Sequence, residues 1–96
     1  MSIHISFSGL KDSSAVKDHI NELMQELLKI TDNKYPFHLN LVRLEDELHQ
    51  VVLNCTYHGK ALSAKSTNSN LYKAISKAVA SMKTQVIKKA QKLRNE

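Results

Sequence analysis

The apolar residues of this 96-residue chain recur at two different periods, and this change of period constrains the fold more than any other feature. Near the N-terminus every second residue is apolar (Ile3, Ile5, Phe7), which is typical of a strand with one buried face. Residues 14–30 instead carry apolar residues three and four positions apart, which predicts an amphipathic helix. The chain is therefore expected to combine strands and helices that each have one apolar face.

The same patterns predict three further strands, over 37–44, 50–57 and 60–66, and a long final helix over 70–94. The acidic residues 45–47 and the pair His58-Gly59 suit the turns of two hairpins. The predicted order is β-α-β-β-β-α, and one apolar stripe per helix favours packing both helices on one face of a four-stranded sheet. The first two strands can run parallel, because a helix joins them, while the later strands pair as antiparallel hairpins. We expect an α+β fold with a mixed sheet, and residues 1–96 forming a single domain.

The positive charge of the chain is concentrated in its last quarter. The net charge is +5, yet residues 1–69 carry seven Lys or Arg against eight Asp or Glu. Residues 70–96 carry seven basic residues against Glu96 alone. Clustered cations indicate a polyanionic partner, because they bind phosphates with release of counterions. The alternative is a cationic surface that serves only solubility.

The final helix separates its charges from its apolar stripe. Its length of about 25 residues corresponds to about 37 Å, enough to follow several successive phosphates. No acidic residue lies within the helix to pair with these cations, and lysines of one sign repel each other mildly. Lysines without base-reading partners suggest recognition of backbone and shape, which favours structured RNA, although lysines alone do not distinguish RNA from DNA. Lys73, Lys77, Lys88 and Lys92 form the outer ridge, Ser81 and Thr84 interrupt it, and Lys83, Lys89 and Arg94 flank the apolar stripe.

Three residues outside the ridge are further candidates for RNA binding. Lys60 and Lys65 lie on the last strand, which leads into the helix, so they can extend the basic surface or simply protect a sheet edge from aggregation. Tyr72 lies at the edge of the apolar stripe, where a packing role competes with a role in stacking on RNA bases.

The sequence offers little to support catalysis, a cofactor or a metal. The five histidines and Cys55 show no close CxxC or HxxxH spacing, and no Gly-rich phosphate loop or nucleophile motif is present. We therefore expect no enzyme activity, no cofactor and no metal site. No signal peptide and no apolar run of about 20 residues is visible, so we expect a soluble, cytoplasmic protein that does not bind membranes.

The stretch 70–75 (Asn-Leu-Tyr-Lys-Ala-Ile), with Ser63-Ala64 before it and Gln85-Val86 and Lys88 after it, resembles the bacterial hibernation-promoting factor and protein Y family. That family has an Asp-Leu/Met-Tyr-x-Ala-Ile stretch followed by a Lys-Leu-x-Arg-Gln-Leu-x-Lys helix, and the resemblance spans essentially the whole chain. It implies a protein that binds the small ribosomal subunit in the decoding region. There the protein would overlap the mRNA and tRNA sites and silence translation in stationary phase and stress, as a free monomer without a small-molecule substrate. A free-standing double-stranded-RNA-binding protein is the alternative.

The chain departs from the family pattern in three respects. Asn70 replaces the acidic residue before Leu-Tyr, and it can still cap a helix without carrying charge. Two basic positions of the family fall on Ser81 and Thr84, while Lys77 and Lys83 add charge beside them. The chain stops at Glu96, so it resembles the short hibernation-promoting type, without a second domain or an acidic tail.

Overall fold

The structure, a computed structural model, describes the backbone of residues 3–45 and 47–94 and the side chains of 3–45 and 47–92. Its elements follow the predicted order β-α-β-β-β-α, which confirms the α+β fold class. They are β1 (Ile3–Ser8), α1 (Ser14–Ile30), β2 (Phe37–Glu45), β3 (Leu48–Tyr57), β4 (Lys60–Asn68) and α2 (Leu71–Arg94).

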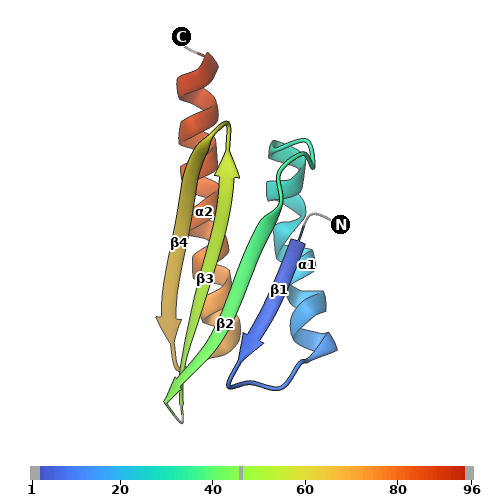
Figure 1. The fold of residues 1–96 in the computed structure, drawn as a ribbon, viewed down its shortest axis with the longest axis vertical. Helices are drawn as coiled ribbons and strands as arrows, with labels where there is room; N and C mark the ends of the chain where they lie inside the picture. Colours follow the sequence, from blue (N-terminus) through green and yellow to red (C-terminus); the bar gives the residue numbers. More distant parts are fainter. Residues whose placement is uncertain (1–2, 46, 95–96) are drawn as a thin grey trace.

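The four strands form one mixed sheet in the order β1-β2-β3-β4. β1 runs parallel to β2, with Ile3 opposite Phe37, whereas β2, β3 and β4 pair antiparallel through hairpins. Figure 1 shows both helices on the same side of this sheet, α1 behind β1 and β2, and α2 behind β3 and β4. The predicted packing of two helices on one face is therefore confirmed, and the other face of the sheet is open.

Alternation along the strands decides which side chains reach the helices. In β2, Phe37, Leu39 and Leu41 are fully buried while His38 and Asn40 are exposed. The strands β3 and β4 follow the same rule, and α2 completes the core with one apolar stripe. These buried residues are Val51, Leu53, Cys55, Tyr57, Leu62 and Ala64 from the strands, and Ala74, Ile75, Ala78, Val79, Met82 and Val86 from α2.

Both helices begin at capping side chains. The Ser13 hydroxyl accepts a hydrogen bond from the amide of Val16, and the Asn70 side-chain oxygen accepts from the amides of Tyr72 and Lys73. These contacts satisfy amides that have no partner within the helix. Asn70 therefore performs the capping role expected of it, which fixes the first turn of α2 where its lysines begin.

The turns lie where the sequence predicts them, but the ends of the neighbouring strands differ from the predicted ones. The acidic turn is tighter than expected, because Glu45 is the last residue of β2 and pairs with Leu48; Asp46 lies outside the described residues. β4 extends to Asn68, two residues beyond the predicted end, since Asn68 still pairs with His49 of β3. The His58-Gly59 turn is confirmed, with φ angles of 50° and 78°.

None of the described helices is long and apolar enough to cross a membrane.

Candidate nucleic-acid interface

The lysines of α2 gather in two clusters near the two ends of the helix. One lies beside the β3–β4 turn and consists of Lys60, Lys88, Lys89 and Lys92; we call it the turn cluster. The other, Lys73 with Lys77, follows the Asn70 cap, and we call it the cap cluster. Figure 1 shows that the last turns of α2 extend beyond the β3–β4 turn, so the turn cluster lies at a projecting end of the molecule.

The turn cluster lines a groove of about 290 Å³ between β4 and α2, with Leu62 and Gln85 as its other lining residues. Gln85 Nε2 donates to the carbonyl oxygen of Ser63 at 2.8 Å, so the helix is tied to the edge strand at this point. Among the residues that the structure describes, no acidic side chain lines the groove. Four cations around a partly apolar groove form a surface suited to phosphates, because no carboxylate among the described lining residues offsets their field.

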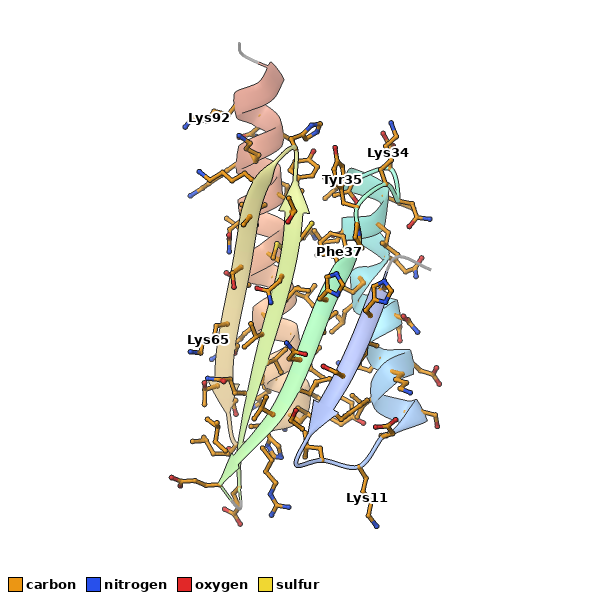
Figure 2. All side chains as sticks on the ribbon, in the orientation of Figure 1. Lys11, Lys34, Tyr35, Phe37, Lys65 and Lys92 are labelled. Carbon is orange, nitrogen blue, oxygen red and sulfur yellow. The ribbon has the colours of Figure 1, made fainter. Side chains whose placement is uncertain are left out.

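Strand alternation separates the two lysines of β4. Lys60 has the same parity as the buried residues Leu62 and Ala64, so it lies on the helix side of the sheet and joins the groove. Lys65 has the opposite parity, pairs with Val52 and projects from the open face (Figure 2). The patch predicted to continue from β4 into the helix therefore includes Lys60, whereas Lys65 lies apart from it.

The cap cluster lines a second hollow, of about 370 Å³, at the start of α2. Tyr72 is 43% exposed, and its ring packs edge-on against the ring of His19 with centroids 4.8 Å apart. The Tyr72 ring therefore packs against His19 and still exposes part of its surface to a ligand. His19 comes from α1 and also lines the hollow, and no spacing in the sequence signals its proximity to Tyr72.

The middle of α2 carries little free charge. Ser81 and Thr84 are exposed, and the Thr84 hydroxyl donates to the carbonyl of Ala80 at 3.1 Å. Lys83 forms an ion pair with Glu26 of α1, so part of its charge is offset by a neighbouring helix. The eleven helical steps from Lys77 to Lys88, at about 1.5 Å each, leave about 16 Å between the two clusters. The ridge, which the sequence already predicts to be interrupted at Ser81 and Thr84, is therefore a pair of basic sites with a neutral interval.

The neighbouring helix limits the basic surface on one side. Asp18, Glu22 and Glu26 are exposed and spaced by four residues, so they share one face of α1, which Lys29 joins at its C-terminal end and which remains net negative. A polyanion would be repelled from that face and attracted to α2 and the adjoining part of β4. The arrangement of charges therefore favours a polyanion that approaches from the side of α2 and β4. Arg94 ends α2, and its side chain lies outside the described residues.

In the described part of the chain, neither a metal-ligand cluster nor an exposed thiol is present. Among these residues no group of three or more His, Cys, Asp or Glu is placed to hold a metal ion. Burial in the core raises the pKa of the Cys55 thiol above its ordinary value of 9.0. The thiol is therefore held in its protonated, weakly nucleophilic form at neutral pH.

The sequence was compared with the profiles of known protein families and with curated proteins. Residues 3–94 match the profile of the family described as Sigma 54 modulation protein / S30EA ribosomal protein. No curated protein matches the chain.

Two solved structures share the fold. The N-terminal domain of Protein Y from Thermus thermophilus superposes with a TM-score of 0.79 at 22% identity, over 90% of this chain and 96% of that one. A ribosomal subunit interface protein from Coxiella burnetii superposes with a TM-score of 0.81 at 16% identity, over 95% of this chain and 99% of that one. At these identities the likeness establishes a common fold.

Proposed function

The chain belongs to the Sigma 54 modulation protein / S30EA ribosomal protein family, and from this premise we propose that it is a ribosome hibernation factor of the bacterial cytoplasm. In this proposal it binds the rRNA of the small subunit in the decoding region, as a monomer, and occludes the sites of mRNA and tRNA. It acts by occupying space and catalyses no reaction. Translation then stops in stationary phase or stress and resumes when the protein leaves.

The two-cluster surface of α2 is the observation that carries this proposal. The turn cluster and the cap cluster lie about 16 Å apart along one helix, and the acidic face of α1 confines them to one side. Two separated cationic sites can hold two phosphate groups of a folded RNA at once, which fixes the orientation of the protein. A rigid body held in this way blocks a channel more effectively than one held at a single point, because it cannot pivot aside.

Individual residues contribute differently in this proposal. Lys60, Lys88, Lys89 and Lys92 bind phosphate through the turn cluster, and Lys73 and Lys77 do so through the cap cluster, with Arg94 extending the turn end. Tyr72 adds a ring surface beside the cap cluster. Lys83 makes a smaller contribution because Glu26 competes for it, and Lys65 contributes only where RNA also reaches the open face of the sheet.

Binding to isolated ribosomal subunits tests the proposal. The protein should co-sediment with small subunits and much less with large subunits, because folded rRNA of one shape is required to meet both clusters. A naked RNA duplex of about 20 base pairs serves as the comparison. Affinity for the duplex equal to that for small subunits would favour a general double-stranded-RNA-binding protein, and failure to bind small subunits at 0.1 M salt would reject the proposal.

A further inference from the structure

Three aromatic rings meet at the end of the molecule where α1 ends and the β3–β4 turn begins. Tyr35 precedes β2, Tyr57 is the last residue of β3, and His58 is the first residue of the turn. The ring centroids of Tyr35 and Tyr57 lie 5.0 Å apart, those of Tyr57 and His58 lie 4.5 Å apart, and those of Tyr35 and His58 lie 5.4 Å apart. We call this group the aromatic tip.

Core packing accounts for only one of the three rings. Tyr57 is 5% exposed and closes the end of the core, whereas Tyr35 is half-buried and His58 is exposed. His58 has a φ of 50°, in the left-handed region that non-glycine residues seldom adopt, and the turn holds its ring beside Tyr35. The Tyr35 hydroxyl lies 3.3 Å from His58 Nδ1 and 3.5 Å from His58 Nε2, so it contacts the edge of the imidazole ring. Two aromatic rings are thus fixed in place at the surface.

A pocket of about 100 Å³ opens beside these rings, lined also by the end of α1 and the loop after it. Its size corresponds to about three water molecules, enough to admit the edge of a planar ring. Asp32 and Lys34 place a carboxylate and an ammonium group at its wall. The carboxylate can accept hydrogen bonds from the N–H groups of a base and disfavours a phosphate inside the pocket. The lysine can bind a phosphate at its rim.

The aromatic tip adjoins the turn cluster. Lys60 pairs with Tyr57 across the β3–β4 hairpin, so the phosphate-binding groove lies on one side of this turn and the aromatic pocket on the other. Figure 2 shows Lys34 and Tyr35 at the same end of the molecule as Lys92, with Lys11 at the opposite end. An RNA strand whose backbone lies along the groove can therefore place its next nucleotide against the rings.

From this arrangement we infer that the aromatic tip binds one unpaired nucleotide of the RNA, with a phosphate near Lys34 or Lys60. Its base stacks on the Tyr35 ring and meets His58 at an angle, because the two rings are tilted 53° from each other. Aromatic rings stack on any base, because every base has a π-face, and extruded single-stranded nucleotides are the usual targets of such rings. The inference rests on the proposed function, since it names a further contact made by the same RNA. It adds a recognition element that does not depend on charge.

Two substitutions test the inference. Tyr35→Leu removes one ring while keeping an apolar side chain, and His58→Asn removes the other while tolerating the left-handed backbone. Tyr35→Leu should weaken binding to small subunits about 5- to 160-fold, the range for loss of one base-stacking ring, and His58→Asn should weaken it less because only an angled contact is lost. The slope of log affinity against log salt concentration should stay unchanged, because no phosphate contact is lost. Tyr35→Phe, which keeps the ring, should bind nearly as well as the unmodified protein.

A second measurement separates this inference from the proposed function. Hexauridylate is titrated into the isotope-labelled unmodified protein, and ring signals of Tyr35 and His58 are followed by NMR, with Phe7 of β1, which lies outside both clusters and the pocket, as the reference ring. Shifts at Tyr35 and His58 would support stacking even if small subunits are not bound. Unchanged affinity of both folded variants for small subunits, together with unshifted ring signals, would overturn the inference and leave the proposed function intact.

Discussion

Replacing Lys88 and Lys92 with glutamine is expected to lower the affinity for small ribosomal subunits about 25- to 60-fold at 0.1 M monovalent salt. Each lysine that neutralises a phosphate releases a fraction of about 0.7 to 0.9 of a counterion. Two lost contacts should therefore also reduce the slope of log affinity against log salt concentration by about 1.4 to 1.8. Equilibrium binding at four or five salt concentrations measures both quantities in one series.

The matched control for this experiment is the replacement of Lys11 and Lys29 with glutamine. These lysines are exposed and lie outside both clusters, so this variant has the same net charge as the first. It should bind almost like the unmodified protein, with the same salt slope. If both variants lose affinity equally, general charge rather than the turn cluster would be responsible for binding.

Replacing Phe37 with alanine is expected to lower the free energy of unfolding by about 3 to 5 kcal/mol, the range for large-to-small changes of a buried phenylalanine. Phe37 is fully buried, and it pairs with Ile3 of β1 and Cys55 of β3 in the sheet (Figure 2). Its loss leaves a cavity between the sheet and the helices. Because small domains are stable by only about 5 to 15 kcal/mol, this single change should remove a large share of the free energy of unfolding.

Urea denaturation followed by circular dichroism measures this loss. Leu44→Ala provides the comparison, since Leu44 is a large apolar residue of the same strand that is 46% exposed. It should change the free energy of unfolding by less than about 1 kcal/mol. Comparable losses in the two variants would contradict the placement of the core on the helix side of β2.

Most of the fold could be predicted because each element carries its own local signal. Alternation along β2 and β3 identified the buried side chains, and Asn70 supplied a capping residue that the structure uses. The ends of the hairpin strands were predicted less accurately, because the pairing of His49 with Asn68 depends on the register of two strands and not on local composition.

The candidate site was predicted only in part. The interruption at Ser81 and Thr84 was visible in the sequence, but the other contacts that shape the two clusters join elements distant in sequence. The parity of Lys60 with Leu62 was visible in the sequence and could have separated it from Lys65. The pairing of Lys83 with Glu26 was not visible, since it requires α1 and α2 to lie side by side. The same holds for the aromatic tip, where Tyr35 meets His58 across 23 positions of the chain.

Competition for the small subunit tests the central claim most directly. Small subunits carrying mRNA and labelled initiator tRNA are titrated with the protein, and both bound tRNA and bound protein are measured by filtration. If the protein occludes the decoding region, tRNA should leave in proportion to the protein that binds, and the Lys88→Gln/Lys92→Gln variant should displace it only at correspondingly higher concentration. Full occupancy of the subunit by the protein with tRNA still bound would contradict occlusion.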